Sequence, residues 1–363
     1  MDFLKTAEFS LLKSPVRQWQ TVCWESPANI ALVKYWGKYD NQIPRNPSIS
    51  FTLGKSKTWM KTDYKSREKD EPNWISLKFE GNENPEFENR IKLYLEKVTK
   101  YLPFLSQIKI RIESNNTFPH SSGIASSASS MSALALCLCT IEDMLFGSLN
   151  DPSIFFRKAS FFARLASGSA CRSLYGGLVS WGKSDHIPGS RDEFAQPFSA
   201  NLHPVFKSFR DAVLIVSSGK KKVSSTKGHA MMNDHPYSET RYLQAEKNLE
   251  QLLTFLRSGN LSGFTGVVEN EAMSIHGMMM TSSPGYILLE PNTIEIIEKI
   301  RRYRKQTGRQ VCFTLDAGPN IHLLYPDRVR EELKDFIITE LLPFCENNNW
   351  IDDEVGPGPK KII

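Results

Sequence analysis

The sequence lacks a long hydrophobic run. Its longest mainly apolar stretch, Met131 to Cys139, is far shorter than the roughly 20 residues that cross a bilayer. Lys5, Glu8 and Lys13 interrupt the first residues, which therefore lack the continuous apolar core of a secretory signal. We expect a globular chain in the cytosol, with no membrane span and no membrane partner.

Sequence patterns for metal sites and disulfides are also absent. The six cysteines include no CxxC pair. Cys137 and Cys139 stand two positions apart in an apolar run, which favours buried free thiols over a disulfide or a zinc site. The seven histidines are dispersed and form no HExxH pattern. The sequence therefore predicts no metal-ligating residues.

A strong excess of one charge is missing as well. The chain has 45 Lys and Arg against 40 Asp and Glu, a net charge of +5. Nucleic-acid binding would need a larger basic excess with interleaved aromatic residues, and the basic turn 219–228 supplies neither. What is present is an ordinary composition, 40% apolar and 23% charged over 363 residues, which suits about two globular domains.

The order of expected elements favours an α+β fold over a doubly wound sheet, because helices and strands mix without strict alternation. A change of rhythm near His203 and Pro204 predicts a boundary between domains 1–203 and 204–363. The polar stretch 55–84 predicts a hairpin with solvated loops. Periodicity predicts helices at 87–105, 151–166 and 238–256, and strands at 108–114, 173–182, 211–218 and 311–316. Residues 121–145 predict a loop that leads into a buried helix.

The segment 118–136, FPHSSGIASSASSMSALAL, is the first candidate site. Small residues that lead into a helix would aim unpaired N–H groups and a partial positive charge at an anion such as phosphate. Gly123 would permit a tight turn, and hydroxyl donors would come from Ser121, Ser122, Ser126 and Ser127. The alternative is a serine-rich cap on a core helix, because the segment is neither a Walker loop nor a GxGxxG.

Two further segments each place one charged residue among small ones. Arg172 lies within ASGSACRSLYGG, where a narrow pocket would let its guanidinium bind a carboxylate or phosphate. Asp316 ends the apolar strand of FTLDAGPNIHLLYP, so it is a candidate base. The alternatives are a surface arginine and an aspartate that braces the following turn.

The segment 26–40, SPANIALVKYWGKYD, ends an apolar strand in a turn that holds Lys34, Tyr35, Gly37 and Lys38. Two cations and a hydroxyl in one turn would suit a phosphate. A solvated turn is the alternative.

In this order along the chain, the four segments resemble the GHMP kinase superfamily and, within it, the mevalonate diphosphate decarboxylases. Residues 119–128 are similar to the superfamily's PxxxGLxSSA phosphate loop. The stretches KYWGK, SGSACRSLYGG and DAGPN are similar to those typical of the decarboxylases. The resemblance implies a two-domain GHMP kinase-like fold, with a ribosomal-S5-like N-terminal domain and an active-site cleft between the domains.

The resemblance also implies an activity in the mevalonate pathway of isoprenoid biosynthesis. With ATP and Mg²⁺, such an enzyme phosphorylates the 3-hydroxyl of (R)-5-diphosphomevalonate and releases phosphate and carbon dioxide to give isopentenyl diphosphate. The resemblance further implies a homodimer.

The family's functional residues carry over to matching positions of this sequence. Catalytic roles fall to Asp316, Arg172 and Lys38. The substrate contacts are Tyr35, Trp36, Gly37, Lys38, Ser167, Gly168, Ser169, Ala170, Cys171, Arg172 and Thr226. The ATP phosphate loop contributes Ser122, Gly123, Ser126 and Ser127.

Two departures leave alternatives open. The phosphate loop has His120, Ser121 and Ser122 where the decarboxylases usually have Thr-Ala-Ala, and no arginine of the 66–82 region aligns with the family's hairpin arginine. The alternatives are a decarboxylase of 5-phosphomevalonate, a kinase of a mevalonate-like alcohol, and a binding protein without catalysis. Arg172 together with Asp316 favours the decarboxylase, because a kinase does not need a residue that binds a departing carboxylate.

Overall fold

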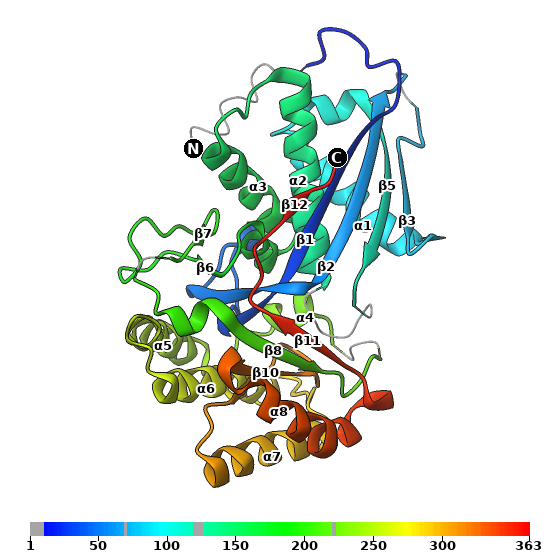
Figure 1. Cartoon of the computed structure of the whole chain (residues 1–363). Coiled ribbons are helices and arrows are strands. Elements are labelled where there is room, and N and C mark those ends of the chain that lie inside the picture. The colour runs from blue at the N-terminus through cyan, green and yellow to red at the C-terminus, as the bar shows by residue number, and fades with distance from the viewer. Residues whose placement is uncertain (1–10, 69–70, 119–125, 200, 220–222) are drawn as a thin grey trace.

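The computed structural model describes residues 11–68, 71–118, 126–199, 201–219 and 223–363. Its helices and strands form two α+β domains, each built on one sheet (Figure 1). Among the described residues, the first sheet has eight strands and the second has four. The predicted mixture of helices and strands in two domains is confirmed.

The first sheet is mainly antiparallel. The long strands β1 (Gln20–Val33) and β2 (Ser48–Ser66) pair with each other, and β2 also pairs with β5 (Ile108–Asn116). The remaining strands are β3 (Ile75–Phe79), which is parallel to β5, and β4 (Asn82–Glu83), β6 (Leu178–Trp181), β7 (Gln196–Pro197) and β12 (Lys360–Lys361).

The predicted hairpin over 55–84 is wrong for its first half. Residues 55–66 belong to β2, which pairs with β1 and β5, and only β3 and β4 form a hairpin. Alternate residues of β2 from Ser56 to Tyr64 are buried, while the lysines between them point outward. Because these lysines point to solvent, the sequence of this regular strand resembles that of a solvated loop.

Helices of the first domain pack on this sheet. They are α1 (Pro85–Val98), α2 (Ser126–Phe146) and α3 (Pro152–Ala166), followed by the 3-10 helix η4 (Gly168–Leu174). As predicted, α3 begins after Asp151, whose side chain accepts a hydrogen bond from the Ser153 N–H. By length and composition α2 could cross a membrane, but 78% of its apolar window is buried, as in the core helix of a globular domain.

The second sheet has the order β11-β8-β10-β9, and every pairing is antiparallel. Its strands are β8 (Phe209–Leu214), β9 (Cys312–Thr314), β10 (Ile321–Pro326) and β11 (Trp350–Glu354). The helices of this domain are α4 (Ser225–Ala230), α5 (Ser238–Ser258), α6 (Leu261–Met280), α7 (Pro291–Thr307) and α8 (Arg330–Phe336).

One hydrophobic core continues from the first domain into the second. Phe51 of β2 stacks on Phe209 of β8, with ring centroids 5.8 Å apart, and both contact Phe264 of α6. Beyond the second sheet the chain returns to the first, where β12 pairs with β1. The domain boundary between residues 203 and 204 stays a prediction. All six cysteines are buried and unpaired, as predicted for Cys137 and Cys139.

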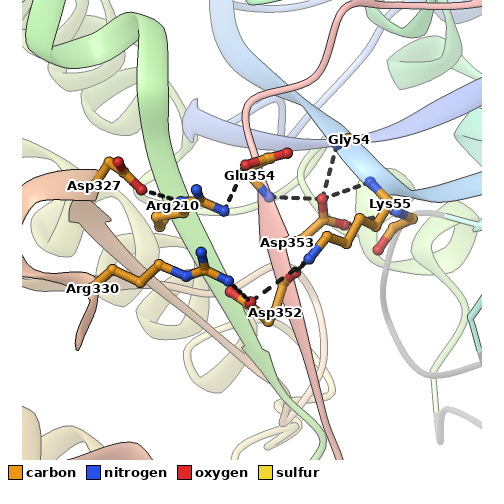
Figure 2. A network of polar contacts seen from close by, with 9 residues as sticks. Gly54, Lys55, Arg210, Asp327, Arg330, Asp352, Asp353 and Glu354 are labelled. Atoms are coloured by element: carbon orange, nitrogen blue, oxygen red, sulfur yellow. Dashed lines mark hydrogen bonds and ion pairs between the residues drawn. The ribbon is translucent and has the colours of Figure 1, made fainter. Parts of the chain in front are cut away.

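A polar network joins β11 to β2 beside this core (Figure 2). The fully buried carboxylate of Asp353 accepts hydrogen bonds from the backbone N–H groups of Gly54, Lys55 and Ser56, at 2.9, 2.7 and 2.8 Å. Around it, Arg210 binds Asp327 and Glu354, and Arg330 binds Asp352. The second domain thus supplies the acceptors for a segment of β2 that has no full set of strand partners.

We expect Asp353→Ala to lower the free energy of unfolding by about 3 kcal/mol, because it leaves the three backbone donors of β2 without their buried acceptor. Asp327→Ala, which removes an exposed ion pair of the same network, should cost less than about 1 kcal/mol. Thermal and urea melting of the two variants measures the difference, and equal losses would contradict the role given to Asp353.

Candidate active site

An ion pair between the two domains lies at the centre of the candidate site. Lys34 follows β1, Asp316 follows β9 after one residue, and Lys34 Nζ lies 3.0 Å from Asp316 Oδ1. The Lys34 side chain is 2% exposed and that of Asp316 is 29% exposed. The ammonium is therefore enclosed by protein, while the carboxylate reaches a surface that a ligand can approach.

Lys34 is held by its backbone as well as by its side chain. Its N–H donates to Glu271 Oε2 at 2.8 Å, and Glu271 is fully buried on α6. The same carboxylate accepts from Arg241 and, at 2.6 Å, from Asn248 of α5. Burial lowers the pKa of Lys34, and the Asp316 carboxylate acts in the opposite direction.

Asp316 is fixed by the turn that follows it. Its backbone carbonyl accepts from Gly318 N–H at 2.7 Å and is 3.1 Å from His276 Nε2 of α6. These contacts hold the backbone while the carboxylate faces Lys34. The predicted apolar strand is present but ends at Thr314, two residues before Asp316, and the catalytic role of Asp316 stays a prediction.

Arg172 is a buried cation held by neutral groups. It lies in η4, is 2% exposed, and donates to Ser48 Oγ at 2.7 Å, Ser50 Oγ at 3.1 Å and Asn29 Oδ1 at 3.3 Å. Within the described parts of the chain, no carboxylate forms an ion pair with it. Burial lowers the pKa of Arg172, and the nearby charge of Asp316 opposes that effect. A buried cation that no carboxylate of the described residues bonds directly is suited to an anionic ligand.

The predicted substrate segment 167–172 packs against the turn after β1. A Cβ at Gly168 would lie 2.6 Å from the Tyr35 hydroxyl, so only glycine fits there. The Tyr35 ring contacts Trp181 edge-on at 4.7 Å, and the Arg172 guanidinium lies 5.8 Å from the Trp181 ring centroid. Ser169 joins this group through its carbonyl, which accepts from Asn29 Nδ2, while Ala170 and Cys171 are buried.

The remaining predicted residues surround the same turn less closely. Lys38 Nζ donates to Gln42 Oε1 at 2.8 Å, and it is Lys34 that pairs with Asp316. Trp36 is buried beside α4, on which Thr226 is exposed. The contacts proposed for Lys38 and Thr226 therefore stay predictions.

The phosphate-loop residues are described only in part. Ser122 and Gly123 lie outside the described residues, as does His120. Ser126 and Ser127 open α2, and Ser127 Oγ is 3.4 Å from Ser167 Oγ, so this helix end lies next to the segment that leads to Arg172. Among the described residues, no group of three or more His, Cys, Asp or Glu side chains is placed to hold a metal ion.

Sequence reasoning missed three parts of this arrangement. The sequence marks Lys34 as a candidate cation of its turn but not as the partner of Asp316; the available signal was that each residue follows a strand. Glu271 lies inside a helix whose sequence shows no motif, so nothing local marks it. The partners of Arg172 on β1 and β2 depend on strand pairing, which no single segment reveals.

Gly37 gives a test of how tightly the turn is built. Its φ of +104° suits glycine, and a Cβ would lie 2.2 Å from the Tyr242 hydroxyl. We expect Gly37→Ala to cost at least about 2 kcal/mol of folding free energy. Gly81→Ala is the control, because its φ is +79° with no atom within 4 Å of the new Cβ, and it should cost about 1 kcal/mol. Equal losses in thermal melting would show that the Tyr242 contact imposes no constraint.

Comparison with known proteins agrees with the geometry. The model for the diphosphomevalonate decarboxylase-like N-terminal domain matches residues 26–195, and the model for the mevalonate 5-diphosphate decarboxylase C-terminal domain matches residues 212–356. The diphosphomevalonate decarboxylase of Gibberella zeae is 30% identical over 319 residues, which cover 84% of this chain and 80% of that protein.

Solved structures show the same fold. The mevalonate diphosphate decarboxylase of Staphylococcus aureus is 26% identical, with a TM-score of 0.81, over 95% of this chain and 99% of that one. MDDEF, solved in complex with MVAPP, AMPPCP and magnesium, is 25% identical, with a TM-score of 0.80 and the same coverage. The family and GHMP kinase-like fold predicted from the four motifs are confirmed: the chain belongs to the diphosphomevalonate decarboxylase family.

Proposed function

We propose that this chain converts ATP and (R)-5-diphosphomevalonate to isopentenyl diphosphate, ADP, phosphate and carbon dioxide. The observation that carries the proposal is the Lys34–Asp316 pair, with its partly exposed carboxylate, within electrostatic reach of the buried Arg172. The Asp316 carboxylate can accept a proton from a hydroxyl, and Arg172, to which no carboxylate of the described residues is bonded, can bind an anionic group. Together they suit a substrate that carries both a hydroxyl and anionic groups. The complex of the similar MDDEF with MVAPP supports this substrate.

Asp316 would act in the first step, phosphoryl transfer. Its carboxylate accepts the proton of the tertiary 3-hydroxyl as that oxygen attacks the γ-phosphorus of ATP, and ADP departs. Lys34, 3.0 Å from Asp316 Oδ1, favours the ionised carboxylate before the transfer and fixes its orientation. Because Lys34 is enclosed by protein, this pair is held in place before the substrate arrives.

Arg172 would act on the anionic part of the substrate. Its three hydrogen-bond partners in the described parts of the chain are neutral oxygens, and Asp316 acts on its charge only from a distance. In the second step the C3–O bond breaks and phosphate leaves with its electron pair, because a phosphate ester leaves where hydroxide cannot. The bond to the carboxylate carbon then breaks, its electron pair forms the new double bond, and carbon dioxide departs. The Arg172 guanidinium orients the substrate throughout.

ATP would bind with its phosphates at the start of α2, where Ser126 and Ser127 lie. Ser122 and Gly123 complete this proposed site by family resemblance. Mg²⁺ in such sites is usually held through substrate phosphates and one or two carboxylates, and it neutralises charge on the phosphates. The similar MDDEF was solved with AMPPCP and magnesium, which supports both cofactors here.

The predicted roles of the neighbouring residues belong to the same proposal. Lys38 and Tyr35 would face the substrate diphosphate together with Ser169 and Thr226, as the family resemblance implies. A homodimer is likewise proposed from the family resemblance, and a cytosolic location from the interrupted apolar pattern of the first residues.

The direct test follows ADP and carbon dioxide together after the purified protein is incubated with ATP, Mg²⁺ and either 5-diphosphomevalonate or 5-phosphomevalonate. We expect the two products in equal amounts, with 5-diphosphomevalonate as the better substrate. ADP without carbon dioxide would identify a kinase. If neither ADP nor carbon dioxide forms, the proposal that the chain is this enzyme is overturned.

Asp316→Asn should lower kcat by about a thousandfold, because the amide cannot accept the hydroxyl proton. Asp327→Asn, a change to an exposed aspartate on the same domain, should leave kcat unchanged. Steady-state kinetics of both variants checks this. A kcat for Asp316→Asn within threefold of the parent would show that Asp316 is not the base.

Arg172→Gln should leave the melting temperature unchanged or raised, because it removes a buried charge to which no carboxylate of the described residues is bonded. The same change should raise KM for diphosphomevalonate about a hundredfold through the loss of charge-assisted hydrogen bonds. Thermal melting and steady-state kinetics give the two values. A large fall in melting temperature with an unchanged KM would make Arg172 a structural residue.

A further inference from the structure

His229 of α4 makes a contact between the domains that the proposed mechanism does not use. Its side chain is 6% exposed, and its Nδ1 accepts the Gly37 backbone N–H at 2.9 Å. Gly37 belongs to the first domain and lies between two predicted substrate contacts, Trp36 and Lys38. One hydrogen bond thus ties the second domain to the backbone of the turn after β1.

Ring contacts strengthen this connection. The His229 ring centroid lies 4.4 Å from that of Tyr35 and 4.7 Å from that of Trp36. The preceding Gly228 is so close to Trp36 that a Cβ would lie 2.6 Å from its Cζ2 atom. A short helix that carries Thr226 is therefore packed against the turn with no room for another side chain.

The ring is suited to this role because it is neutral. Burial, and then the neighbouring ammonium of Lys38, lower the pKa of His229 to about 3. Since Nδ1 accepts the hydrogen bond from Gly37, the neutral ring carries its proton on Nε2. The acceptor is available at every pH at which the enzyme would work.

We propose that His229 is a positioning residue, which holds the turn 35–38 of the first domain against α4 of the second so that their substrate contacts face one another. This inference rests on the proposed function, since the contacts it aligns are those assigned to diphosphomevalonate. His229 acts through Gly37, Tyr35 and Trp36 and is not itself assigned a contact with the substrate. The substrate would then bind to residues of both domains that are already held in place, so less conformational entropy is lost on binding.

Three variants separate positioning from general stability. His229→Leu keeps a side chain of similar size but removes the acceptor, whereas His229→Asn places an amide oxygen near the position of Nδ1. His235→Leu is the matched control, because His235 is a buried histidine of the same domain whose Nε2 contacts Met278 O at 3.0 Å and Thr281 Oγ1 at 3.1 Å.

In steady-state kinetics we expect His229→Leu to raise KM for diphosphomevalonate about tenfold, because a buried N–H loses its acceptor. His229→Asn should return KM most of the way to the parent value. His235→Leu should lower the melting temperature, while its KM stays within twofold of the parent. The proposal is overturned if KM of His229→Leu stays within twofold of the parent, or if His229→Asn binds no better than His229→Leu.

A second measurement does not depend on catalysis. In protein labelled with ¹⁵N-histidine, the His229 ring should give the signals of a neutral ring protonated at Nε2, unchanged between pH 5 and 8. In protein labelled with fluorotryptophan, the Trp36 signal should shift in His229→Leu but not in His235→Leu. The positioning role is overturned if the His229 ring titrates in this range or if the Trp36 signal does not move in His229→Leu. Both readouts test this role whether or not the proposed reaction is observed.

Discussion

The candidate site depends on a lysine that the fold encloses at the junction of its two sheets. An ammonium removed from water is costly unless a carboxylate compensates it, and the compensating carboxylate of Lys34 comes from the other domain. Lys34 follows β1 of the first sheet and Asp316 follows β9 of the second, so the pair forms only when the domains are docked. Glu271 strengthens the same junction by accepting the Lys34 backbone N–H.

Docking is fixed by elements outside the site. The shared core around Phe51, Phe209 and Phe264 supplies apolar contact, and Asp353 supplies the hydrogen-bond acceptors for the bent segment of β2. These contacts allow the site to hold Arg172 without a protein carboxylate bonded to it. The net charge of +5 says little by itself. Its local distribution says more, because Lys34, Lys38 and Arg172 gather around one turn, with Asp316 paired to the first of them.

Much of the fold could be predicted because its signals are local. The N-cap at Asp151, the apolar run of α2 and the strand before Asp316 each depend on a few adjacent residues. β2 could not be recognised in the same way, since its outward lysines looked like a solvated loop. The four motifs identified the family correctly, yet they did not show that Lys34 is the partner of Asp316. That pairing, like the contact of Glu271 with Lys34, joins residues more than two hundred positions apart, and only the docked domains reveal it.

The central claim is that Lys34 and Asp316 act as one unit across the domain junction. A double-mutant cycle in kcat with Lys34→Met, Asp316→Asn and the double variant measures this coupling most directly. We expect the double variant to be no slower than Asp316→Asn alone, within about threefold, because Lys34 acts through the carboxylate. If the two single losses in kcat instead multiply in the double variant, Lys34 and Asp316 act independently and do not form one unit.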